Sequence, residues 1–93
     1  MSDELHIAGI VVHAIPEGVE RATASIAEMP GAELHATSRD GKLVVTLEAS
    51  SAREIAAGIE RIQQLPAVMS ASLVYQHNEA LEAMMEEVPH GNH

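Results

Sequence analysis

The stretch Leu5–Ala14, which reads Leu-His-Ile-Ala-Gly-Ile-Val-Val-His-Ala, predicts a β-strand, because apolar and β-branched residues dominate it and no helical stripe fits. Side chains alternate along a strand, so both faces of this one are apolar. One face carries Ala8, Ile10 and Val12, and the other carries Ile7 and Val11. Such a strand is typical of the middle of a sheet, so we place it between two others, with helices closing one face.

Composition limits the chain to one small domain with an aliphatic core. The 93 residues include no Cys and a single aromatic residue, Tyr75. The absence of Cys excludes a disulfide framework, a thiolate nucleophile and a Cys-based metal site. No apolar run is long enough to cross a membrane, and the acidic N-terminus lacks the basic region of a signal peptide. We therefore expect a cytoplasmic protein.

The net charge of −9 argues against nucleic acid and anionic membranes as partners, because both carry negative charge. A basic partner would be attracted and its association accelerated. Acidity alone also keeps a small protein soluble, and the charge is compatible with that simpler explanation.

The rest of the chain predicts two helices and three further strands. These are a helix from Pro16 to about Glu28, strands over Ala32–Ser38 and Leu43–Ala49, a helix ending near Gln64, and a strand over Val68–His77. The pair Asp40-Gly41 predicts a hairpin. Ser51 followed three residues later by Glu54 fits a capping box at the start of the second helix.

The order β-α-β-β-α-β predicts an α+β, ferredoxin-like fold: a four-stranded antiparallel sheet with both helices on one face. The first strand then lies between the third and the fourth, as its two apolar faces require. We assign residues 1–78 to this domain and 79–93 to an acidic, Met-rich C-terminal tail. Ala80–Glu87 fits a short helix, and Pro89–His93 is expected to be loose.

Alternation divides the strand residues into two sets. The set expected to face the helices is Ala8, Ile10, Val12, Leu34, Ala36, Leu43, Val45, Leu47, Met69, Ala71 and Leu73. The set expected on the open face is Ile7, Gly9, Val11, His13, Glu33, His35, Thr37, Val44, Thr46, Glu48, Ser70, Ser72, Val74 and Gln76. An apolar patch with acid beside it suits a segment that is apolar and has basic residues nearby. The small residues Gly9, Ser70 and Ser72 are expected to leave space in the middle of the open face. The tail or a second copy covering the patch, or ordinary exposed apolar surface, remain alternatives.

No sequence motif indicates catalysis. The chain contains no phosphate-binding loop, no dinucleotide fingerprint, no nucleophile elbow and no zinc-protease motif. Its six histidines are His6, His13, His35, His77, His90 and His93. Their spacing does not define the three or four converging ligands of a metal site. We therefore expect a protein that is not an enzyme and holds no metal or cofactor.

Four stretches carry a resemblance to a known family. They are Ile10-Val11-Val12, Met29-Pro30-Gly31-Ala32-Glu33, Lys42-Leu43-Val44-Val45-Thr46-Leu47-Glu48 and Ser72-Leu73-Val74-Tyr75. In these stretches, and in its size and element order, the chain resembles the NapD family, cytoplasmic maturation chaperones of the periplasmic nitrate reductase. The resemblance spans Ile7 to about His77.

The resemblance implies a chaperone that binds the twin-arginine signal peptide of the nitrate reductase catalytic subunit. Binding restrains export until the molybdenum cofactor and iron–sulfur cluster are inserted. We expect a monomer whose carboxylates at Glu33 and Glu48 pair with the arginines. We expect the peptide across the open face rather than added as a strand at an edge. The predicted contacts are Ile7, Gly9, Val11, His13, Glu33, His35, Val44, Thr46, Glu48, Ser72, Val74 and Gln76.

Two other functions stay open for a ferredoxin-like domain, because a fold does not fix a function. A regulatory module would bind a small ligand and form a stable dimer. A metal-binding module would take up zinc, copper or nickel through its histidines.

Overall fold

The computed structural model describes residues 4–80, and these contain the two helices and four strands predicted for the domain. The elements are β1 (Glu4–Ala14), a short 3-10 turn η1 (Pro16–Gly18), α1 (Val19–Ala27), β2 (Ala32–Thr37), β3 (Lys42–Ala49), α2 (Ala52–Gln63) and β4 (Val68–Ala80). The predicted order is therefore confirmed. The first helix differs in one detail, since its Pro16 end is a 3-10 turn that precedes the α-helix.

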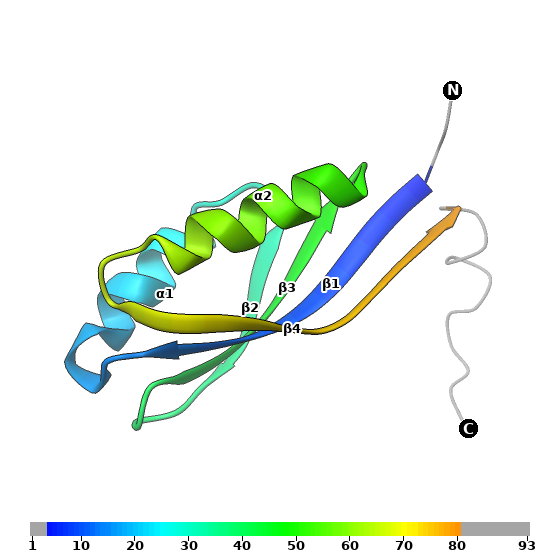
Figure 1. The fold of residues 1–93 in the computed structure, drawn as a ribbon. Helices are drawn as coiled ribbons and strands as arrows, with labels where there is room; N and C mark the ends of the chain where they lie inside the picture. Colours follow the sequence, from blue (N-terminus) through cyan, green and yellow to red (C-terminus); the bar gives the residue numbers. More distant parts are fainter. Residues whose placement is uncertain (1–3, 81–93) are drawn as a thin grey trace, which may run out of the picture.

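The four strands form one antiparallel sheet in the order β2-β3-β1-β4, with β1 in the interior as predicted. Both helices lie on one side of this sheet, α1 near β2 and α2 along β3, β1 and β4 (Figure 1). The α+β, ferredoxin-like prediction is confirmed. The sheet consequently has one face that the helices cover and one face that they leave open.

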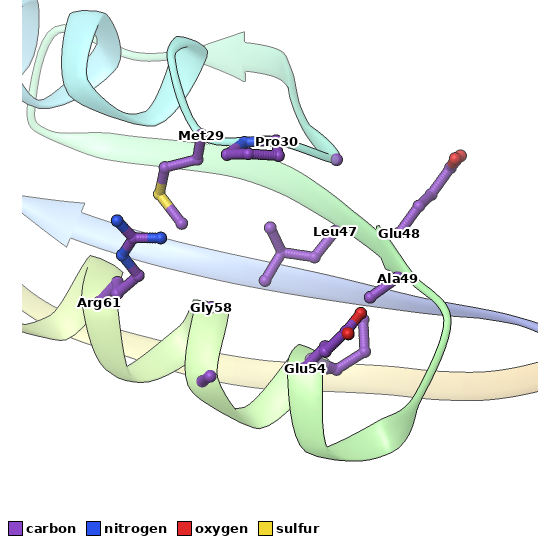
Figure 2. A pocket seen from close by; sticks show the side chains of 11 residues that line it. Met29, Pro30, Leu47, Glu48, Ala49, Glu54, Gly58 and Arg61 are labelled. Carbon is purple, nitrogen blue, oxygen red and sulfur yellow. The ribbon is translucent and has the colours of Figure 1, made fainter.

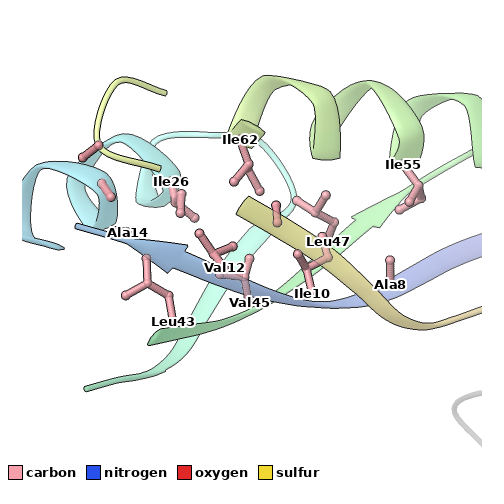
Figure 3. Close-up of a cluster of buried hydrophobic side chains, with 13 residues drawn as sticks. Ala8, Ile10, Val12, Ala14, Ile26, Leu43, Val45, Leu47, Ile55 and Ile62 are labelled. Carbon is pink, nitrogen blue, oxygen red and sulfur yellow. The ribbon is translucent and has the colours of Figure 1, made fainter. Parts of the chain in front are cut away.

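The helix-side face of the sheet is closed by an aliphatic cluster (Figure 3). Strand residues Ala8, Ile10 and Val12 are 1% exposed or less. They pack in one cluster with Ile26 of α1 and Ile62 of α2, also fully buried. Each fully buried valine or isoleucine side chain in this cluster contributes about 1.5–3 kcal/mol to folding. The apolar pattern of the sequence therefore predicts this side of the molecule well.

Two glycines lie where the backbone requires a positive φ. Gly31 follows α1 with φ +81°, and its carbonyl accepts a 2.9 Å hydrogen bond from the Glu48 N–H. Gly41 in the β2–β3 hairpin has φ +104°. Any residue with a side chain would be strained at either glycine.

In the same hairpin, the Ser38 hydroxyl donates a hydrogen bond to Asp40. This hydrogen bond is the main cause that lowers the pKa of the Asp40 carboxyl.

The start of α2 differs slightly from the predicted capping box. Ser51 is the N-cap, and its hydroxyl accepts a 3.1 Å hydrogen bond from the Glu54 N–H, as predicted. The Glu54 carboxylate, however, reaches one residue further back than expected. It accepts from both the N–H and the hydroxyl of Ser50, at 3.2 and 3.1 Å. The cap therefore ties the end of β3 to the first turn of the helix.

Three residues on the edge strands interrupt the regular pairing. They are His35 in β2 and Met69 and Val74 in β4, each skipped between consecutive pairs of the register. Such β-bulges insert one extra residue and shift the alternation of the residues beyond it. The two interior strands, β1 and β3, pair with each other without interruption from His6 to His13.

The bulges correct the predicted faces of three residues. Ala36 pairs with Val44 and so lies on the open side, while Thr37 pairs with Leu43 on the helix side, the reverse of the prediction. Gln76 pairs with Ala8 and lies on the helix side, so its predicted place on the open face is wrong. Tyr75 takes that place, opposite Gly9.

The helices also fail to cover all of the residues predicted to face them. Leu73 pairs with Ile10 on the helix side but is 48% exposed, and Met69 is 66% exposed. Both lie on the edge strand β4, and Met69 is one of its two bulge residues. Only Ala71 of the three predicted β4 positions is buried.

β4 continues to Ala80, three residues past its predicted end at His77. The helix predicted over Ala80–Glu87 would begin at a residue that belongs to β4 instead, and residues 81–93 of the predicted tail lie outside the described residues. Within residues 4–80, no helix has the length and apolar character needed to cross a membrane.

Candidate functional site

The centre of the open face is an apolar row that crosses all four strands. Cross-strand pairing places in this row Ser72, Val11, Val44 and Ala36. Val11 is half-buried and Val44 is 37% exposed. Directly opposed β-branched side chains contact each other across a sheet. This row therefore gives an apolar strip that neither α1 nor α2 covers.

The next row is built around the glycine of β1. It consists of Tyr75, Gly9, Thr46 and Glu33. The bulged residue His35 also joins this side, because its Nε2 lies 2.8 Å from the Thr46 hydroxyl. The row thus begins with an aromatic residue on the edge strand β4 and ends with a carboxylate on the edge strand β2.

Polar and charged residues border these two rows. Beyond the glycine row, Ile7 of β1 pairs with the exposed Glu48 of β3. Beyond the apolar row, His13 pairs with Lys42 on one side, and its Nδ1 lies 3.5 Å from the Ser70 hydroxyl on the other. The acidic Glu48 therefore lies at one end of the open face, and the basic Lys42 lies at the opposite end.

Ten of the twelve residues predicted as contacts fall together on this open face. They are Ile7, Gly9, Val11, His13, Glu33, His35, Val44, Thr46, Glu48 and Ser72. Val74 is the unpaired bulge residue and is 62% exposed, and Gln76 is on the helix side. The apolar patch predicted from four residues is therefore centred on three: Ile7, Val11 and Val44.

The space predicted above Gly9 is filled by Tyr75. A Cβ placed on Gly9 would lie 2.7 Å from both Cδ2 and Cζ of the tyrosine ring, closer than real atoms approach. The ring thus occupies the place of the missing glycine side chain. Sequence reasoning missed Tyr75 as a face residue, although a glycine inside a strand is itself a signal of close approach. Aromatic side chains often cover such glycines.

The helix side carries a cleft of about 350 Å³ between the end of α1, β3 and α2 (Figure 2). Its walls include Met29, Leu47 and Gly58, with Arg61 and Glu54 at its rim (Figure 2). The Glu54 carboxylate is already occupied by Ser50 in the helix cap. One of the two charged groups at the rim of the cleft is therefore already engaged within the protein.

Metal ligation has no geometric support in the described part of the chain. Across residues 4–80, no group of three or more His, Asp or Glu side chains gathers closely enough to hold an ion. The two histidines of the open face, His13 and His35, are engaged with Ser70 and Thr46 respectively.

A four-stranded sheet with two helices on one side and a mixed apolar and acidic surface on the other defines a ferredoxin-like binding domain. The model of the NapD protein family matches residues 5–80. The chain therefore belongs to the NapD family, as its sequence predicted.

A solved structure of the same kind is the solution structure of the E. coli Tat proofreading chaperone protein NapD. It is 26% identical to this chain, with a TM-score of 0.76, and the match covers 100% of this chain and 96% of that one. No curated protein sequence matches the chain.

Proposed function

We propose that this protein is a chaperone that binds the twin-arginine signal peptide of the catalytic subunit of the periplasmic nitrate reductase. It restrains export until cofactor insertion is complete. Its membership of the NapD family supports this function, as does its similarity to a structure described as a Tat proofreading chaperone. The proposed place of action is the cytoplasm, where the precursor waits before export.

The surface chemistry of the open face is the main structural support for this proposal. A twin-arginine signal peptide has a basic start followed by an apolar stretch. The face offers an apolar strip around Val11 and Val44, with the exposed carboxylates Glu33 and Glu48 beside it. The chain as a whole has a net charge of −9, so a basic segment is drawn towards it from a distance. The two halves of such a peptide thus meet complementary surfaces.

The proposed contacts are the residues that share this face. The apolar stretch lies on Ile7, Val11 and Val44, with Val74 at the edge. The arginines pair with Glu33 and Glu48, because guanidinium groups form strong hydrogen bonds with carboxylates. Gln76 is excluded by its place on the helix side.

The mechanism is stoichiometric: one monomer holds one peptide, and no bond is made or broken. Binding competes with the export machinery for the same segment, so timing depends on affinity and release. A lower occupancy, caused by weaker binding or by a competing partner, lets export proceed.

The direct test is calorimetric titration of the protein with a synthetic signal peptide at low and moderate salt. A second peptide has both arginines changed to alanine. We expect one-to-one binding that weakens with this change and with added salt, because charged pairs are screened.

The opposite result is also informative. Absence of binding at tens of micromolar, which corresponds to a binding free energy of about −6 kcal/mol or weaker, would overturn the proposal. The helix-side cleft of Figure 2 would then be the place to test for a small ligand.

A further inference from the structure

Tyr75 stands apart from the rest of the composition. It is the single aromatic residue among 93, in a chain whose buried core is wholly aliphatic. Aromatic side chains usually contribute their large apolar area to a core. This one lies on the open face instead, with 47% of its surface exposed. Its position therefore contributes little to the core and needs another explanation.

Two local features bring the ring to this position. The bulge at Val74 shifts the alternation of β4, so that Tyr75 rather than Gln76 pairs onto the open face. Gly9 on the neighbouring strand then leaves room for the ring, which comes within 2.7 Å of the place where a Cβ would lie. The ring is thus held against the backbone of the central strand, in the middle of the proposed binding surface.

Acid lies on the same side of the sheet. Glu48 is on β3, opposite Ile7 and therefore two residues along β1 from Gly9. With strands about 4.8 Å apart and residues rising about 3.3 Å each, the backbone of Glu48 is about 8 Å from that of Gly9, over which the ring lies. Glu33 ends the row that starts at Tyr75. A cation above the ring is then within reach of a carboxylate.

We propose that Tyr75 is the arginine platform of this face, and that its ring stacks on a guanidinium of the twin-arginine pair while Glu48 accepts that group's hydrogen bonds. This inference rests on the proposed function and specifies how the arginines are recognised. A planar guanidinium can stack on an aromatic ring and still direct its N–H groups outwards to a carboxylate. An ammonium group cannot do both in the same way, so the site distinguishes arginine from lysine.

The test is a double-mutant cycle measured by calorimetry at low salt. The proteins are the wild type, Tyr75→Leu and Tyr75→Phe, and the peptides carry Arg-Arg or the single changes Arg-Ala and Ala-Arg. We expect Tyr75→Leu to weaken the Arg-Arg peptide about threefold to tenfold, in line with exposed cation–π pairs. Tyr75→Phe keeps the stack and should restore affinity to within about twofold. For the peptide that lacks the stacked arginine, the affinities of Tyr75→Leu and the wild type should be nearly equal.

Leu73→Ala is the matched control. Leu73 lies two residues away on the same strand and is 48% exposed, but it is on the helix side. We expect it to leave affinity unchanged. Gly9→Ala is the converse test, since it puts a methyl group where the ring lies and should weaken the Arg-Arg peptide as Tyr75→Leu does.

Spectroscopy can detect the contact between Tyr75 and the arginine without any protein variant. Tyr75 is the sole source of tyrosine fluorescence, and there is no Trp or Phe. Titration with an aromatic-free peptide should change this fluorescence. It should also move the side-chain methylene proton signals of one arginine upfield by the ring current. The Arg-to-Lys peptide should bind more weakly and show a smaller upfield shift.

The outcomes separate this inference from the proposed function. If the wild type binds the Arg-Arg peptide but Tyr75→Leu weakens all peptides equally, or weakens none, the ring is not an arginine platform and the chaperone function stands. If the wild type binds no signal peptide, both are overturned.

Discussion

The two faces of β1 differ although they belong to one strand. On the helix side, Ala8, Ile10 and Val12 are 1% exposed or less and form the middle of the core. On the open side, Val11 is only half-buried, and Gly9 is covered by a ring from the next strand. The first face therefore determines whether the chain folds, and the second is available to a partner. Substitutions on the two faces should separate stability from binding.

The largest effect is expected on the helix side. Ile10→Ala removes a side chain that is 1% exposed and packs in the central cluster, leaving a cavity between sheet and helices. It should lower the free energy of unfolding by about 2–5 kcal/mol, measured by urea denaturation. At low temperature the remaining folded protein should bind the signal peptide normally. A loss below about 1 kcal/mol would contradict this account of the core.

The neighbouring residue on the other face should behave in the opposite way. Val11→Asp puts a carboxylate in the apolar row opposite Val44, where the apolar stretch of the peptide is proposed to lie. We expect affinity to fall tenfold or more, about 1.4 kcal/mol, while stability falls by about 1 kcal/mol or less. Val44→Asp should act in the same direction.

Ala24→Asp is the control for this change, because it adds the same charge at an exposed position of α1. It should leave both affinity and stability nearly unchanged. Normal affinity of Val11→Asp would show that this face is not the binding surface, and an unfolded Val11→Asp protein would count against the separation of folding from binding on the two faces.

The same division explains what could be predicted from the sequence. The interior strands β1 and β3 alternate without interruption, so their buried residues follow from the apolar pattern alone. The edge strands contain the bulges, at His35, Met69 and Val74. A bulge depends on how an edge strand accommodates the twist of its neighbour, and the apolar pattern does not encode it. The faces of Ala36 and Gln76 were therefore predicted wrongly.

The open face shows the same limit. Val11, Val44 and Glu48 could be placed on it because they lie on interior strands with regular alternation. Tyr75 could not, because a single inserted residue decides which side it faces. The available signal was Gly9, a glycine in the middle of a strand, which indicates that another group approaches closely. The sequence does not say which group that is.

Two serine-to-alanine substitutions compare the helix side with the open face again, with smaller expected effects. Ser51→Ala removes the hydroxyl that accepts from the Glu54 N–H at the start of α2. It should lower the free energy of unfolding by about 1 kcal/mol, measured by urea denaturation, without changing peptide affinity. Ser72→Ala makes the same chemical change at an exposed position on the open face, so its stability should stay within about 0.5 kcal/mol of wild type. Equal losses from the two would mean that the cap does not stabilise the helix.

The smallest effect is expected from charge. Glu48→Gln keeps the size of an exposed side chain on the open face but removes its negative charge. Affinity for the Arg-Arg peptide should fall about threefold at low salt, and the difference should shrink as salt is added, because exposed ion pairs are weak and screened. Stability should stay within about 0.5 kcal/mol of wild type.

Glu60→Gln removes the same charge from an exposed position of α2 on the helix side. Its effect on affinity should be smaller than that of Glu48→Gln, because long-range attraction depends on total charge whereas a hydrogen-bonded pair depends on position. Equal, salt-dependent losses from both variants would show that the acidity of the chain attracts the peptide without locating it. A loss confined to Glu48→Gln would place an arginine on the open face, next to the ring that covers Gly9.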